Sequence, residues 1–184
     1  MRTHVALLRG INVGGNNKVP MADLRELMTS LGYTDVATYI QSGNVVFTSQ
    51  DTDSGKLADV LDEKIAERFG VPGHVVVVSR DELARVIADN PYPDESNPKA
   101  LHAVFRKSDL TADDLDRVEK ARQRASDKGC HDEVTVAART LFLHAPDGIG
   151  RSELAIQLSR TSSMRVGTAR NWATVTKLMA MLDE

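Results

Sequence analysis

Two short stretches of the sequence are apolar at every position, and they limit the folds that the chain can adopt. Residues 5–8 read VALL and residues 75–78 read VVVV. A strand with one face in water alternates apolar and polar residues, whereas a strand buried on both faces does not. Both stretches are therefore expected to be strands of a sheet that is covered on both sides.

The segments around these two stretches alternate between strand and helix patterns. A strand over about 4–13 precedes a helix at about 21–31, whose apolar residues recur at i, i+3, i+4 and i+7. Two strands joined around Ser42-Gly43, a second helix near 57–69 and a strand at 74–79 follow. The order β-α-β-β-α-β within 79 residues predicts a ferredoxin-like unit.

The second half of the chain repeats this order in part. Ser79 and Glu82 have capping-box spacing and predict a helix over 80–89, and the prolines that follow exclude regular structure. The remaining pattern predicts a strand, a charged helix, a hairpin and two helices, at 101–107, 111–126, 132–145, 152–159 and 168–182. The predicted fold class is α+β, with duplicated ferredoxin-like units packed into one compact body. The expected domains are 1–90, a proline-rich connector at 91–99, and 100–184.

Composition excludes several classes of protein. The only cysteine is Cys130, so the chain forms no intrachain disulfide and no zinc finger, which suits a cytoplasmic location. The apolar run near the N-terminus is too short for a signal peptide or a membrane span, so no membrane association is expected. Apolar residues at 41% are enough for a sizeable core.

Charge is distributed unevenly along the chain. Residues 1–22 hold three basic residues and no acidic one, and residues 154–182 hold four basic residues, Arg165 among them, and no acidic one. The net charge is nevertheless −3, which argues against wholesale nucleic-acid binding. Aromatic residues at 4% also argue against an RNA-recognition motif, which stacks bases on strand aromatics. If the two basic ends meet, they form a local surface that attracts anions.

The loop between the first strand and the first helix is the first candidate site. It reads Gly14-Gly15-Asn16-Asn17-Lys18 and ends where Pro20 favours the first turn of a helix. Backbone N–H groups and the positive end of a helix dipole bind phosphates and carboxylates, and glycines allow close approach to the backbone. The glycine spacing fits neither a phosphate-binding P-loop nor a dinucleotide fingerprint. The alternative is a turn whose asparagines satisfy the backbone.

Two further segments place a basic residue at the start of a helix. Gly148, Gly150 and Arg151 precede a helix that Ser152 is expected to cap. In TARNWATVTKL, Thr168 is expected to cap the last helix, which places Arg170 and Asn171 in its first turn. An arginine there is unfavourable unless an anion or a carboxylate offsets it.

Metal and catalytic patterns are weak. The four adjacent residues of CHDE at 130–133 cannot converge on one ion, so no metal site is expected. His102 and His144 lie on different predicted strands and are candidates for neighbours. They lack the Ser or Thr two residues later that two-histidine phosphoesterases need, so each is interpreted as structural.

Four of these segments carry a resemblance to a known family. ALLRGINVGGNNKVPM, YIQSGNVVF, PDGIGRSEL and TARNWATVTKL resemble the bacterial family called domain of unknown function 1697. The resemblance extends over nearly the whole chain. It implies an α+β protein built on ferredoxin-like elements, and it implies no established activity.

The leading hypothesis is a small anionic or phosphate-bearing ligand, with no cofactor and no metal. Lys18 and Arg170 would neutralise the anion, the backbone of Gly14 to Asn16 would bind its oxygens, and Asn44 and Asn171 would orient it. The full set of candidate ligand-binding residues is Arg9, Asn12, Gly14, Gly15, Asn16, Lys18, Ser42, Asn44, Arg151, Arg170 and Asn171. Two alternatives stay open: phosphoester or nucleotide hydrolysis with His102 or His144 as general base, and a structural or protein-interaction role without a ligand.

Overall fold

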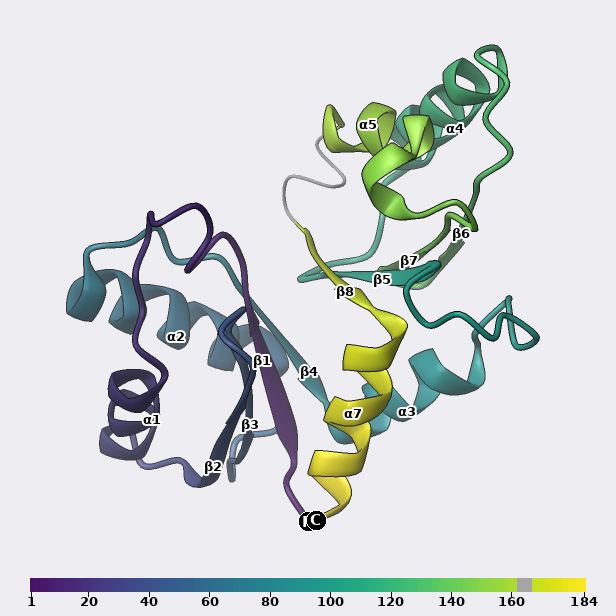
Figure 1. Cartoon of the computed structure of the whole chain (residues 1–184). Helices are drawn as coiled ribbons and strands as arrows, with labels where there is room; N and C mark the ends of the chain where they lie inside the picture. The colour runs from purple at the N-terminus through teal and green to yellow at the C-terminus, as the bar shows by residue number, and fades with distance from the viewer. Residues whose placement is uncertain (162–166) are drawn as a thin grey trace. The chain divides into compact units, whose positions relative to one another are not determined.

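The computed structural model describes residues 1–161 and 167–184, and the chain forms two compact units. Unit 1 comprises Met1–Arg85 and Lys177–Glu184, and unit 2 comprises Val86–Thr176. Each unit is a four-stranded antiparallel sheet with helices, which identifies a mixed α+β protein of duplicated ferredoxin-like units (Figure 1). Arg165, counted above in the basic C-terminal segment, lies outside the described residues.

Unit 1 has the strand order β2-β3-β1-β4, with β1 paired to both β3 and β4. Its strands and helices are β1 (His4–Leu8), α1 (Met21–Ser30), β2 (Thr34–Tyr39), β3 (Asn44–Thr48), α2 (Ser54–Phe69) and β4 (Val75–Ser79). The first strand is therefore shorter than the predicted 4–13, because from Arg9 onward the chain leaves the sheet as a loop.

Unit 2 repeats the arrangement with the strand order β6-β7-β5-β8. Its elements are β5 (Leu101–Arg106), α4 (Ala112–Ser126), β6 (Glu133–Ala137), β7 (Thr140–His144), the short helix η1 (Ile149–Arg151), α5 (Glu153–Ser159) and β8 (Gly167–Asn171). Two helices, α3 (Arg80–Ala88) and α7 (Trp172–Asp183), contribute residues to both units. The capping box predicted at Ser79 and Glu82 is present, since each side chain accepts a hydrogen bond from the other's backbone N–H.

The prediction that the last helix begins near Thr168 is wrong. Residues 167–171 form strand β8, which pairs with β5 from His102 to Arg106. Unit 2 therefore completes the order β-α-β-β-α-β, instead of ending differently from unit 1. Helix α7 begins at Trp172, and its first turn is capped by Asn171, whose Oδ1 accepts from the N–H of Thr174 at 2.9 Å.

Strands β1 and β4 of unit 1 are buried on both faces, as their continuous apolar sequence predicts, whereas the outer strand β2 is partly exposed. On one face, Ala6 and Leu8 of β1 pack with α1 and α2 in a core that includes Leu24 and Leu61. The opposite face is also buried, at 0–3% exposure for Val5, Leu7, Val46, Val76 and Val78. The packing of the two halves into one body stays a prediction.

The C-terminal end of α7 is fixed to the start of unit 1. The N–H of Arg2 donates to the carbonyl of Leu182 at 2.8 Å, and its Nη1 donates to the carbonyl of Met181. Arg80 donates two hydrogen bonds, at 2.8 and 2.6 Å, to Oδ1 of Asp183. The last turn of the chain therefore belongs structurally with the first strand.

One buried histidine makes the stability of unit 1 depend on pH. His4 is 3% exposed, its ring is stacked on Phe47, and its Nε2 has no hydrogen-bond partner among the described residues. Burial lowers the pKa of His4 below its usual 6.5, against smaller opposing effects of the Glu82 and Asp51 carboxylates.

We predict that replacing His4 reduces the loss of stability in acid. The unfolded chain takes up a proton below pH 6.5 that folded His4 resists, so the free energy of unfolding falls as pH drops toward the lowered pKa. Urea unfolding of wild type and His4→Leu at about pH 7.5 and about pH 5 measures this. The variant should lose less stability than wild type between the two values. Equal losses would show that His4 does not titrate in this way.

Candidate functional site

The loop between β1 and α1 contains a narrow turn at residues 13–16. The N–H of Asn16 donates to the carbonyl of Val13 at 3.1 Å, and Gly14 and Gly15 both have left-handed backbones, with φ of 59° and 80°. Among the described residues, nothing accepts from the N–H groups of Gly14 and Gly15. The N–H of Asn16 is already bonded within the turn. Of the three N–H groups predicted to bind a ligand, only those of Gly14 and Gly15 therefore remain available.

Asn12 holds the base of this loop closed. Its Nδ2 donates to the carbonyls of Val19 and Gln41 at 2.9 and 2.8 Å, and its Oδ1 accepts from the N–H of Val19 at 2.9 Å. Its backbone N–H donates to the carbonyl of Asn17 at 3.0 Å. Asn12 is therefore a positioning residue, because its side-chain groups are used to fix the loop.

The same contacts join the loop to the β2–β3 hairpin, so the structure brings together two of the predicted segments. The N–H of Leu8 donates to the carbonyl of Gly43, and Asn44 donates through Nδ2 to Tyr39 O and Ser42 Oγ, both at 3.0 Å. Asn44 is fully buried. Ser42 and Asn44 thus shape the hairpin beside the loop.

The positive groups of the loop lie on its surface. Lys18 is exposed and Arg9 is half-buried at the end of β1. Helix α1 begins three residues after Lys18, and its N-cap, Pro20, provides no side-chain hydrogen bond. Asp23 brings one negative charge to the first turn. The loop therefore combines a cation, two N–H groups and a helix N-terminus without a side-chain cap.

Arg170 does not lie at a helix start. It is the fourth residue of β8, paired opposite Ala103 and 9% exposed, and its Nη1 donates to Thr168 Oγ1 and to the carbonyl of Ala169. Burial lowers the pKa of its guanidinium to about 10. The predicted first-turn positions of Arg170 and Asn171 are wrong, because the strand continues to Asn171.

The predicted site residues are divided between the two units. Arg9 to Lys18, Ser42 and Asn44 belong to unit 1, while Arg151, Arg170 and Asn171 belong to unit 2. Arg151 is exposed and lines a hollow of about 430 Å³ together with Lys128, whose Nζ lies 2.6 Å from Glu153 Oε1. Within unit 1, described contacts join Asn12 of the loop to the hairpin that carries Ser42 and Asn44.

His102 and His144 cannot act together on one substrate. In the ladder His102 faces Leu143, and His144 faces Leu101, so the two side chains lie on opposite faces of the sheet. Burial lowers the pKa of His102, whose Nδ1 has no partner among the described residues. His144 Nε2 lies 2.7 Å from Glu95 Oε2, and this hydrogen bond, with a second from the N–H of Asn97, holds the pKa of Glu95 below its usual range.

The environment of His144 was not foreseen from the sequence. Tyr92, from the proline-rich connector, stacks on the His144 ring at 4.6 Å and bonds Thr135 Oγ1 through its hydroxyl at 3.1 Å. The position of Tyr92 between two prolines indicates this packing, because a connector that is exposed to solvent gains nothing from a large aromatic side chain. The connector is thus packed on β6 and β7.

Neither a metal cluster nor a membrane span is found in the described parts of the chain. No group of three or more His, Cys, Asp or Glu side chains there could hold a metal ion, and Cys130 Sγ instead contacts Asp132 Oδ2 at 3.2 Å. No described helix is long and apolar enough to cross a bilayer.

The chain belongs to the family described as "Protein of unknown function (DUF1697)", whose model matches residues 1–142. It is similar to a solved structure described as that of a conserved bacterial protein from Streptococcus pneumoniae, at 25% identity and a TM-score of 0.76, over 98% of each chain. A comparison with curated proteins finds no match. The family and the fold are therefore established, and neither brings a named activity.

We predict that Asn12→Ala destabilises unit 1 by about 2–3 kcal/mol, because Ala leaves the backbone groups of Val19 and Gln41 without their partner and occupies a left-handed backbone. Asn16→Ala, in the same loop but exposed, is the matched control and should change stability by less than about 0.5 kcal/mol. Chemical denaturation measures both. Similar effects of the two substitutions would contradict the anchoring role of Asn12.

The hairpin approaches β1 closely at Gly43, so we predict that an alanine there destabilises the protein more than an alanine at Gly15. A Cβ at Gly43 would lie 2.7 Å from both Leu8 Cβ and Ile11 Cδ1, whereas a Cβ at Gly15 meets nothing within 4 Å. Both glycines have positive φ, so Gly15→Ala should cost about 1–2 kcal/mol and Gly43→Ala about 1–3 kcal/mol more. Thermal unfolding of the two variants measures the difference. Equal melting temperatures would show that the hairpin yields to the added methyl.

Proposed function

We propose that the protein binds a small anionic or phosphate-bearing ligand at the loop between β1 and α1. The N–H groups of Gly14 and Gly15 bind the oxygens of the anion, Lys18 neutralises it, and Asn12 holds the loop in place. Arg9, the first residue of the loop after β1, adds a second positive charge. This form of the proposal needs only residues of unit 1.

The observation that carries the proposal is the contrast between the two duplicated units. In unit 2, the helix that follows the first strand is α4, and its N-terminus carries a capping box formed by Thr111 and Asp114. The Asp114 carboxylate also pairs with the buried Arg106 at 3.1 Å. At the corresponding point of unit 1, α1 has no side-chain cap, and an exposed lysine and a glycine turn precede it. Both helices carry an aspartate at the third position, Asp23 in α1 and Asp114 in α4, so the difference between them is the missing side-chain cap. A ligand anion would supply at α1 the hydrogen-bond acceptor that the Thr111–Asp114 capping box supplies at α4.

Hydrolysis at this loop has no observation in its favour. It needs a general base within hydrogen-bond reach of the bound phosphate. The two candidate bases, His102 and His144, lie on opposite faces of one sheet and cannot serve one phosphate together, and His144 is engaged with Glu95. We therefore propose binding without a reaction.

We predict that inorganic phosphate or a nucleoside monophosphate shifts the backbone amide resonances of Gly14 and Gly15. Lys18→Ala should raise the dissociation constant by about tenfold or more, since a hydrogen bond to a charged group contributes about 1.5–3 kcal/mol. NMR titration of the labelled protein measures both effects.

Lys99→Ala is the control, because Lys99 is an exposed lysine of unit 2. It should leave the dissociation constant unchanged. An equal loss of affinity in both variants would indicate nonspecific attraction of anions. Shifts confined to other residues, or no shift with either compound, would disprove the proposal.

A further inference from the structure

The open edge of β6 in unit 2 has unused hydrogen-bonding capacity. The strand order β6-β7-β5-β8 leaves β6 paired on one side only, by β7. The two-residue connection Ala138–Arg139 makes Ala137 and Thr140 a hydrogen-bonded pair, so the backbone groups of Val134 and Val136 point away from β7. Among the described residues, nothing bonds to the backbone of either valine on that side.

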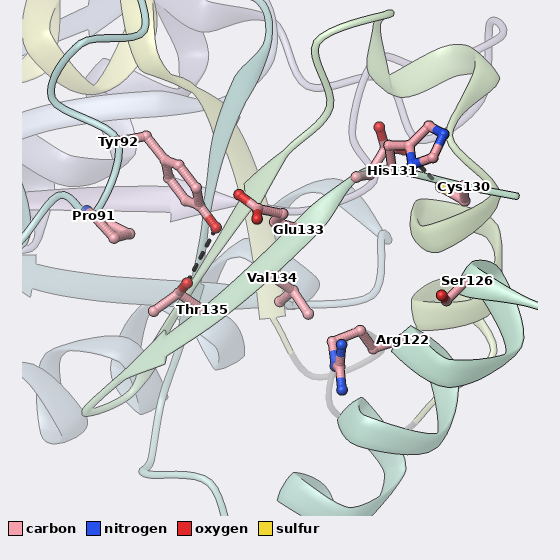
Figure 2. Close-up of a pocket in the computed structure, with 10 residues that line it drawn as sticks. Pro91, Tyr92, Arg122, Ser126, Cys130, His131, Glu133, Val134 and Thr135 are labelled. Atoms are coloured by element: carbon pink, nitrogen blue, oxygen red, sulfur yellow. Dashed lines mark hydrogen bonds between the residues drawn. The ribbon is translucent and has the colours of Figure 1, made fainter.

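A groove follows this edge. It has a volume of about 500 Å³, and six of its ten lining residues are the consecutive residues 130–135. Pro91 and Tyr92 of the connector form one wall, and Arg122 and Ser126 of α4 form the other. Figure 2 shows Tyr92 and Thr135 on one side of the strand, and Val134 and Arg122 on the other. The volume is in the range of known binding sites, about 300–1,000 Å³.

The connector wall is held rigidly before any partner arrives. The N–H of Tyr92 donates to Asn90 Oδ1 at 2.9 Å, its ring stacks on His144, and its hydroxyl bonds Thr135. His144 is held in turn by Glu95. A preformed groove reduces the ordering cost of binding.

The start of the strand is acidic. Asp132 and Glu133 both line the groove, and the side chain of Glu133 is 64% exposed, with His144 Nδ1 at 3.9 Å from its Oε2. The guanidinium of Arg122 on the far wall is already paired with Glu119 through two hydrogen bonds. The carboxylates of Asp132 and Glu133 therefore leave this end of the groove with a negative charge that a basic residue of a partner could pair with.

We propose that the edge of β6 binds an extended peptide segment of a partner protein as an added antiparallel strand. The backbone of Val134 and Val136 bonds the peptide backbone, and a lysine or arginine of the peptide lies beside Asp132 and Glu133. The outer strand of unit 1 is less suited to this role. The register of β2 shifts between Thr34 and Ala37, where Asp35 has a φ of 53°, and such a bulge blunts an edge.

The test uses the full chain and a designed probe, the capped peptide acetyl-KTVTVTK-amide. At ten times its dissociation constant, the peptide should slow hydrogen exchange of the Val134 and Val136 amides about tenfold. Two versions of the peptide, N-methylated at odd or at even positions, remove the donors on one edge or the other. One version should bind and the other should fail, because only one edge of the peptide faces β6.

Charge is tested with Glu133→Lys, matched by Glu63→Lys, since Glu63 has a similarly exposed side chain, at 65% against 64% for Glu133. Glu133→Lys should weaken binding of the lysine peptide at least threefold and strengthen binding of acetyl-ETVTVTE-amide, while Glu63→Lys changes neither.

Three results would overturn the proposal. The first is unchanged exchange at Val134 and Val136 with the peptide at saturating concentration. The second is equal binding of both N-methylated peptides. The third is protection of the two valines that rises with protein concentration without peptide, which would make a second copy of the chain the occupant.

Discussion

The burial of β1 on both faces is the constraint on which the rest of unit 1 depends. Each peptide group of a strand buried in this way must find its partner in a neighbouring strand, since no water reaches it. The pairing of β1 with β3 and β4 meets this requirement from His4 to Leu8. At the end of the strand the N–H of Leu8 bonds the carbonyl of Gly43, and one residue further on the N–H of Arg9 bonds the carbonyl of His74. The loop that follows therefore starts from a fixed point.

Duplication repeats the backbone but not the polar groups placed on it. The first strand of unit 1 ends in an apolar leucine, whereas β5 ends in Arg106, which is 5% exposed. The buried guanidinium of Arg106 pairs with the carboxylate of Asp114, which lies in the first turn of α4. The same carboxylate also takes part in the capping box at the N-terminus of α4. In unit 1 a longer loop leads to α1, whose N-cap Pro20 offers no side-chain hydrogen bond, so the two equivalent helix starts differ in how they are capped.

Hydrophobic pattern predicted most of the fold, and it failed where a strand carries few apolar residues. The helices and strands of unit 1 follow directly from apolar spacing. Strand β8 reads GTARN, which has no apolar run, and it adjoins a strong helical pattern, so the sequence pattern predicts a helix where the strand lies. The burial of Arg170 has no sequence signal, because arginine is normally exposed. By contrast, period two alone places His102 and His144 on opposite faces once their strands are paired in register. The contact of Asn12 with Gln41, 29 residues apart, needed the structure.

Backbone strain distinguishes the loop and the hairpin of unit 1 from ordinary turns. Three non-glycine residues there, Asn12, Asn17 and Ile40, have φ between 51° and 54°. Asparagine tolerates this conformation, but a β-branched residue does not, and such positions cost about 1–3 kcal/mol each. Burial of the Ile40 side chain does not offset this cost, because the side chain is 52% exposed. Val13, in the loop that Asn12 joins to the hairpin, is 67% exposed. The strained positions must therefore be held by the hydrogen bonds that join the two segments, those of Asn12 with Gln41 and of Leu8 with Gly43.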